Sequence, residues 1–123
     1  SGEWELSGLN PCVRVNQYGP GGFLGPHRDA PFSPHVDERS LCTILIPLLS
    51  QGATRFYHAK GVLDARGLTV QEEVHRRGGL IAGFDTTDVQ LRAGCPVLFG
   101  QGMLHEGLPL GAGEHAKAVL RTD

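Results

Sequence analysis

Short runs in which apolar and polar residues alternate recur along this chain and predict β-strands. Residues 13–18 (Val-Arg-Val-Asn-Gln-Tyr) and 53–58 (Ala-Thr-Arg-Phe-Tyr-His) show this alternation, which is typical of strands with one buried face. Residues 41–49 form the most hydrophobic segment, so we expect a central strand that is buried on both faces. Pro47 cannot donate a ladder hydrogen bond, so it should mark a bulge or the end of that strand.

Weaker patterns complete the expected set of elements. Trp4 and Leu6 alternate with polar residues in segment 1–10, which favours an edge strand there. In residues 59–88 the alternation fades, and a short helix at 69–79 and a charged hairpin are equally good alternatives. Further extended segments are predicted at residues 23–29, 95–99 and 117–121.

The glycine and proline content narrows the fold class. The chain of 123 residues contains 18 glycines and eight prolines, which favour turns and short strands over long helices. About eight short strands separated by turns predict an all-β domain, a barrel or jelly roll with at most one or two short helices. The length fits one domain, and 40% apolar with 20% charged residues is typical of a globular rather than a disordered chain.

Charge and cysteine content exclude several classes of protein. The net charge of −2 provides no basic surface for nucleic acid or an anionic membrane. No apolar run is long enough to span a membrane, and no signal peptide opens the sequence. The three widely spaced cysteines argue against a structural zinc site, and we expect reduced, mostly buried thiols at Cys12, Cys42 and Cys95. The odd cysteine count and the lack of a signal peptide favour a cytoplasmic location, whereas nothing indicates the oligomeric state.

Candidate metal chemistry begins at the pair His27-x-Asp29. In an extended chain, residues two apart project from the same face, so this imidazole and carboxylate point the same way. They supply two of the three ligands of the 2-His-1-carboxylate triad, which holds non-haem Fe(II) and leaves coordination positions open. The pair alone has low specificity, and the triad requires one more histidine from a distant part of the chain.

Four motifs follow one another along the chain and raise that specificity. They are Tyr18-Gly-x-Gly-Gly-x-x-x-Pro-His27-x-Asp29, Gly52-Ala-Thr-Arg-Phe56, the glycine-led strand at 92–99, and His105-Glu-Gly-x-Pro109 followed by Gly113 and Lys117. Together they resemble the prolyl 4-hydroxylase-like catalytic domain of the 2-oxoglutarate/Fe(II)-dependent oxygenase superfamily. The resemblance covers most of the chain, from about residue 13 to residue 123.

The resemblance implies a fold and an activity. The fold would be a double-stranded β-helix, with residues 1–123 forming a single catalytic domain that a longer chain could contain. The activity would be a dioxygenase that uses Fe(II), 2-oxoglutarate and O2, with ascorbate as a possible requirement, to hydroxylate a C–H bond and release succinate and CO2. A peptidyl proline is the expected substrate. A free amino acid or small molecule is the alternative, as is a catalytically silent barrel that binds metal and 2-oxoglutarate.

The resemblance also assigns roles to individual side chains. The implied iron ligands are His27, Asp29 and His105. The distal carboxylate of 2-oxoglutarate needs a cation inside an otherwise apolar barrel. Lys117 and Arg121 lie four residues apart on the closing strand and so face one side. Lys117 matches the family position, whereas Arg121 offers a bidentate fork and is slightly preferred on that chemistry. The hydroxyl of Tyr18 is expected to bond the cosubstrate.

Some positions depart from the family pattern or remain open. Gln51 stands where the first of two glycines is usual, and residues 59–88 are longer than the compact family pattern. Arg55 could contact substrate at the barrel mouth, and a surface role is equally good. The four other histidines lack metal-ligand spacing, and we expect them on the surface: His35, His58, His75 and His115.

Overall fold

The computed structural model describes residues 3–59 and 84–123, and it contains only strands and loops in these ranges. Its strands are β1 (Arg14–Tyr18), β2 (Leu24–His27), β3 (Cys42–Pro47), β4 (Ala53–Ala59), β5 (Phe84–Gln90), β6 (Val97–Gly100), β7 (His105–Gly107) and β8 (Lys117–Thr122). The predicted all-β class is therefore confirmed for the described residues, among which no helix could cross a membrane. The alternatives at 69–79 lie outside the described residues.

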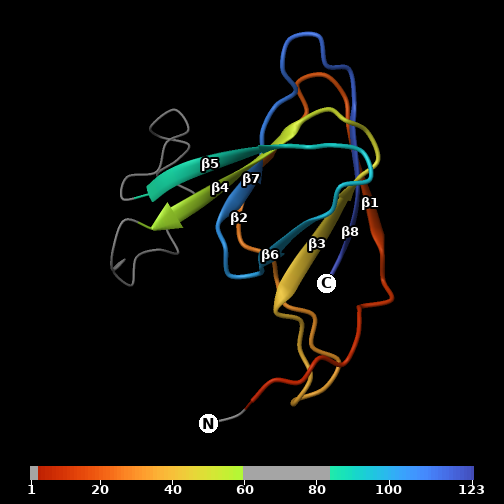
Figure 1. Cartoon of the computed structure of the whole chain (residues 1–123), viewed down its shortest axis with the longest axis vertical. Coiled ribbons are helices and arrows are strands. Elements are labelled where there is room, and N and C mark those ends of the chain that lie inside the picture. Colours follow the sequence, from red (N-terminus) through yellow and green to blue (C-terminus); the bar gives the residue numbers. More distant parts are fainter. Residues whose placement is uncertain (1–2, 60–83) are drawn as a thin grey trace.

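The strands form two antiparallel sheets of four strands each (Figure 1). The first sheet has the order β1-β8-β3-β6, and the second has the order β2-β7-β4-β5. Most neighbours within a sheet come from distant parts of the sequence, since β1 pairs with β8, β2 with β7 and β3 with β6. This topology brings the segment around residue 27 beside the segment around residue 105.

The apolar core lies between the two sheets. Its buried members are Leu45, Phe56, Leu91, Phe99 and Val119, which come from strands of both sheets and from the turn after β5. Phe56 and Phe99 meet edge to face, with ring centroids 5.0 Å apart, a contact worth about 0.5–1.5 kcal/mol beyond the area it buries. The ring of Phe99 also lies 4.6 Å from that of His105, so the core directly supports the site described below.

The strand predicted at residues 13–18 is present, but its polar face, not its apolar face, points inward. Val13 and Val15 are 54% and 57% exposed, whereas Asn16 and Tyr18 are half-buried and line a pocket. The apolar–polar alternation gave the right period and the wrong face, because the inner side of β1 borders a polar pocket instead of the apolar core. Hydrophobicity alone does not locate the inner face of such a strand.

The most hydrophobic segment forms β3, which lies between β8 and β6 as predicted for a central strand. Its burial alternates: Thr43, Leu45 and Pro47 are buried, while Ile44 and Ile46 are half-buried. The expected burial on both faces is therefore wrong for the described part of the chain, where only one face of β3 packs against the other sheet. Pro47 ends the strand, as predicted.

Three local predictions fail. No strand forms in residues 3–10, where alternating apolar residues lack a neighbouring strand to pair with. The strands β5 and β7 were not predicted, because β5 is polar along most of its length and β7 has only three residues. The cysteines are free, as expected, but exposed instead of buried, since they lie in loops or on the outer face of β3: Cys12, Cys42 and Cys95.

Candidate metal centre

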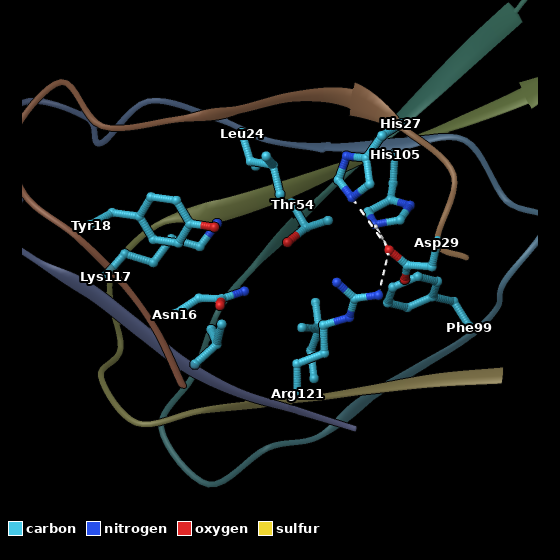
Figure 2. Close-up of a pocket in the computed structure, with 13 residues that line it drawn as sticks. Asn16, Tyr18, Leu24, His27, Asp29, Thr54, Phe99, His105, Lys117 and Arg121 are labelled. Atoms are coloured by element: carbon cyan, nitrogen blue, oxygen red, sulfur yellow. Dashed lines mark ion pairs between the residues drawn. The ribbon is translucent and has the colours of Figure 1, made fainter. Parts of the chain in front are cut away.

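The pairing of β2 with β7 assembles a cluster of three potential metal ligands. His27 ends β2 and lies directly opposite His105, the first residue of β7, so their ring centroids are 4.3 Å apart. Asp29 follows two residues after His27 and points to the same place (Figure 2). One ligand atom from each of these side chains lies within 4.8 Å of the others. The structure thus brings together the three residues that the sequence predicted as iron ligands.

Backbone carbonyls orient both imidazoles. Nδ1 of His27 lies 2.8 Å from the carbonyl oxygen of Gly25, and Nδ1 of His105 lies 2.9 Å from that of Met103. Each Nδ1–H can donate to its carbonyl, which leaves Nε2 as the atom that faces the carboxylate of Asp29, at 3.4 and 3.7 Å. A neutral imidazole with its second nitrogen fixed in this way is the form that binds a metal ion.

One oxygen of Asp29 lacks a hydrogen bond although it is buried. Oδ2 accepts a hydrogen bond of 2.7 Å from the Thr43 hydroxyl. Oδ1 faces the two imidazoles, and no described residue donates a hydrogen bond of acceptable geometry to it, although Nη2 of Arg121 lies 2.9 Å away as an ion pair. Buried carboxylate oxygens without a hydrogen bond are rare. A divalent cation between this oxygen and the imidazoles would satisfy it, so the residues present fit a metal ion.

The electrostatics of the cluster suit metal binding. Burial alone would raise the pKa of Asp29, but the adjacent His27 imidazole, the hydrogen bond from Thr43 and the positive charge of Arg121 lower it to about 2. The adjacent Asp29 carboxylate raises the pKa of His27, and burial lowers the pKa of His105. The carboxylate is therefore ionised at neutral pH and His105 is neutral, as metal binding requires, whereas the raised pKa of His27 favours a proton that a metal ion would have to displace.

A pocket extends from the cluster and ends at a buried cation. The triad lies at one end of this pocket, and Lys117 and Tyr18 lie at the other (Figure 2). Lys117 is 5% exposed, and its Nζ lies 5.0 Å from the centre of the Tyr18 ring. No hydrogen bond or ion pair joins this Nζ to another described residue. Burial lowers the pKa of Lys117, and the charge of Glu114 opposes that change only in part.

Two glycines leave the space that the Lys117 side chain occupies. A Cβ on Gly107 would lie 3.0 Å from Nζ of Lys117. A Cβ on Gly52 would lie 2.8 Å from Cδ of the same side chain, and the φ of Gly52 is +88°, which side chains rarely adopt. The position of Lys117 therefore depends on the absence of side chains at both glycines.

Three further side chains line the pocket: Tyr18 beside Lys117, and Thr54 and Asn16. Tyr18 lies opposite Lys117 in the β1–β8 register, and burial raises the pKa of its hydroxyl, which therefore remains protonated. Thr54 and Asn16 were missed as site residues by the sequence analysis. Thr54 is 2% exposed and belongs to the Gly52–Phe56 motif, which could have identified it. Asn16 precedes Tyr18 by two residues on β1, so the period of the strand places both side chains on one face.

The two cations of β8 line the same pocket, as predicted, but they lie at different ends. Arg121 is beside the triad, where its guanidinium pairs with Asp29 and its side chain is 20% exposed. Lys117 is at the far end, next to Tyr18 (Figure 2). The sequence argument treated the two as alternatives for one role, whereas the structure separates them in space.

The remaining candidates lie outside the pocket. The Arg55 guanidinium makes two hydrogen bonds to Asp88, of 2.7 and 2.9 Å, across the β4–β5 pair. Arg55 alternates along β4 with Thr54 and Phe56, so it faces away from the pocket. Three of the other histidines are exposed, as predicted, and the fourth lies outside the described residues: His35, His58, His115 and, undescribed, His75.

Comparison with family models and with curated proteins found no match for this chain. The family suggested by the motifs consequently stays a proposal. Its support comes from the motifs in the sequence and from the geometry of the triad and the pocket.

Proposed function

We propose that this chain is an Fe(II)- and 2-oxoglutarate-dependent dioxygenase related to the prolyl 4-hydroxylases. The observation that carries the proposal is one pocket with a His-Asp-His cluster at one end and the buried ammonium of Lys117 at the other. A small dicarboxylate has complementary chemistry, because one carboxylate can bind at the metal while the other pairs with the ammonium. Burying a cation without an ion pair costs free energy, so an ammonium at this position favours an anionic ligand in the pocket.

The strand pairing supports a double-stranded β-helix as the fold of this enzyme. The pairs β1–β8, β2–β7, β3–β6 and β4–β5 are nested, as in one long antiparallel hairpin whose innermost strands are β4 and β5. When the two arms of such a hairpin wind around a common axis, successive strands fall into two facing sheets. The observed orders β1-β8-β3-β6 and β2-β7-β4-β5 are the orders that this winding generates.

In the proposed enzyme, His27, Asp29 and His105 would hold the metal ion, and a set of two histidines and one carboxylate leaves coordination positions open for other ligands. When bound, Fe(II) supplies the redox chemistry that couples decarboxylation of 2-oxoglutarate by O2 to hydroxylation of a C–H bond. The carbonyls of Gly25 and Met103 keep both imidazoles turned toward the ion. Thr43 does the same for the carboxylate by holding its other oxygen.

The far end of the pocket would hold the distal carboxylate of 2-oxoglutarate. The ammonium of Lys117 provides the charge, and the hydroxyls of Tyr18 and Thr54 are the neighbouring donors. Lys117 is favoured over Arg121 for this role, because the guanidinium already lies beside Asp29 while the ammonium has no ion pair with a described residue. The bidentate guanidinium had slightly favoured Arg121 when only the sequence was considered.

The proposed substrate is a peptidyl proline, with a free amino acid or another small molecule as the alternative. This part of the proposal is carried by the resemblance of the four motifs to the prolyl 4-hydroxylases. A peptide library incubated with the loaded enzyme and read by mass spectrometry tests it. A mass gain of one oxygen atom on proline-containing peptides is expected, and a gain confined to free amino acids would favour the alternative.

The activity itself is tested by succinate formation from 2-oxoglutarate with Fe(II), ascorbate and O2. The His27→Ala and Asp29→Ala variants should form no succinate, because each loses a metal ligand. The His58→Ala variant is the matched control, since His58 is exposed and outside the pocket, and it should retain wild-type turnover. Absence of both iron binding and turnover in the wild type would refute the proposal. Binding of iron and 2-oxoglutarate without turnover would favour a catalytically silent barrel.

A further inference from the structure

The ion pair between Arg121 and Asp29 bears directly on how the triad takes up a metal ion. Nη2 of Arg121 lies 2.9 Å from Oδ1 of Asp29. Oδ1 is also the oxygen that faces Nε2 of His27 and His105, at 3.4 and 3.7 Å. The guanidinium therefore contacts the same carboxylate oxygen that the triad offers to a metal ion.

A guanidinium and a divalent cation that contact the same carboxylate oxygen repel each other. Both are positively charged, and Asp29 is buried, so solvent screens their repulsion only weakly. The other oxygen of Asp29 is already engaged by the Thr43 hydroxyl, so the carboxylate cannot rotate to serve each cation with a separate free oxygen. Metal binding at Oδ1 requires the guanidinium to withdraw from that oxygen or to share it at an electrostatic cost.

The surroundings of Arg121 allow its side chain to withdraw while its backbone stays fixed. β8 lies between β1 and β3, and Arg121 is in register with Arg14 on one side and Leu45 on the other. The side chain is 20% exposed, so part of it is open to water. A long flexible stem can move such a head group without disturbing the strand.

We infer that Arg121 is a positioning residue that sets the metal affinity of the site. It holds the Asp29 carboxylate in the metal-free triad and releases Oδ1 of Asp29 when a metal ion binds. The inference rests on the proposed function, since it takes the His27-Asp29-His105 cluster as the metal site. In the metal-free chain, Arg121 provides the countercharge for a buried carboxylate. In the metal-bound chain, the metal ion replaces it.

Co(II) binding to the metal-free full chain tests the inference. The Arg121→Met variant keeps most of the side-chain volume and removes the competing charge. We expect it to bind Co(II) about tenfold more tightly than the wild type, as removal of a competing charge-assisted contact implies. The Arg14→Met variant is the matched control, because Arg14 lies opposite Arg121 on the neighbouring strand but is exposed. Its Co(II) affinity should stay within twofold of the wild type, about 0.4 kcal/mol.

Unfolding measurements separate this role from a merely structural one. Without metal, Arg121→Met should lower the denaturation midpoint, because Asp29 becomes a buried carboxylate without a countercharge. With saturating Co(II), the deficit should vanish or reverse. A residue with only a structural role would give the same deficit in both states and an unchanged or weaker Co(II) affinity, and either result would overturn the inference. Arg121→Lys, which keeps the charge at a shorter reach, should fall between wild type and Arg121→Met.

The same titrations distinguish failure of this inference from failure of the proposed function. If the wild type binds Co(II) and the Arg121→Met affinity is unchanged or weaker, only the inference about Arg121 fails. If the wild type and the variants bind no Co(II), the cluster is not a metal site and both proposals fail. The ligand-field absorption of bound Co(II), lost in His105→Ala, shows that the ion measured lies in the triad.

Discussion

Replacement of the Lys117 ammonium should affect cosubstrate binding and stability in opposite directions. In Lys117→Met, the distal carboxylate of 2-oxoglutarate would lose its countercharge in a buried pocket. A charge-assisted hydrogen bond contributes about 1.5–3 kcal/mol, so the affinity for 2-oxoglutarate should fall by about tenfold to more than a hundredfold. The metal ligands are untouched, so the affinity for the metal alone should not change.

The ligand-free Lys117→Met variant should be more stable than the wild type. Lys117 is 5% exposed and lacks an ion pair with any described residue, and the charge of Glu114 compensates its buried ammonium only in part. An apolar side chain of similar length removes this cost, and the free energy of unfolding should rise by about 1 kcal/mol or more. Loss of binding together with a gain of stability is expected of a functional residue rather than a packing residue.

The stability difference should also depend on pH. Burial lowers the folded-state pKa of Lys117 below its ordinary value of 10.5, so between the two pKa values the unfolded chain binds more protons. The wild type therefore gains stability as pH rises from the folded-state pKa towards 10.5. The advantage of Lys117→Met should be fully present at neutral pH and should shrink as the solution becomes alkaline.

Calorimetric titration of 2-oxoglutarate into the Mn(II)-loaded chain measures the affinity, and urea unfolding measures the stability. Arg121→Met is the comparison variant in the same titration and should weaken 2-oxoglutarate binding less than Lys117→Met. If the order is reversed, Arg121 holds the distal carboxylate, as its bidentate chemistry suggested. If neither variant weakens binding, the assignment of 2-oxoglutarate to this pocket is refuted.

Two further predictions concern the acid side of the stability curve and the space around Lys117. The folded-state pKa of Asp29 is lowered to about 2, so the metal-free chain should lose roughly 2 kcal/mol of stability as pH falls from about 4 to about 2. Asp29→Asn should remove this pH dependence in urea unfolding, and parallel curves would contradict the assignment. Gly107→Ala places a Cβ 3.0 Å from Nζ of Lys117 and should weaken 2-oxoglutarate binding several-fold, by about 1 kcal/mol. Gly100→Ala, where a Cβ meets nothing within 4 Å, is the matched control and should bind normally.

The all-β class and the first two members of the candidate metal cluster, His27 and Asp29, were predictable from the sequence because both depend on local rules. Alternation of period two marks strands, and it also places His27 and Asp29 on one face. The partnership with His105 came from the resemblance of the closing motif, since 76 residues separate Asp29 from His105 and local rules give no contact at that range. The antiparallel register that sets His27 opposite His105 becomes visible only in the folded chain.

The different positions of the two cations on β8 could not be predicted from the sequence. Strand period places Lys117 and Arg121 on one face, and the structure agrees. Their separation depends on the neighbours: β1 sets Tyr18 opposite Lys117, while the loop after β2 brings Asp29 to Arg121. Side-chain chemistry favoured the Arg121 guanidinium as the anchor for the distal carboxylate. The neighbours of each cation instead leave Lys117 without an ion pair and therefore as the better candidate.

The buried polar residues explain why sequence hydrophobicity misplaced the inner face of β1. Most of the buried polar side chains belong to the triad, its support or the pocket: Asp29, Thr43, Thr54, His105 and Lys117. Each is costly to bury unless it is paired. Oδ1 of Asp29, which is buried without a hydrogen bond, and Nζ of Lys117, which has no ion pair with a described residue, lie where ligands are proposed to bind. A strand that borders such a pocket turns polar side chains inward, as Asn16 and Tyr18 do. Ligands that satisfy these atoms bind only the folded chain, so metal and cosubstrate together should stabilise it by mass action.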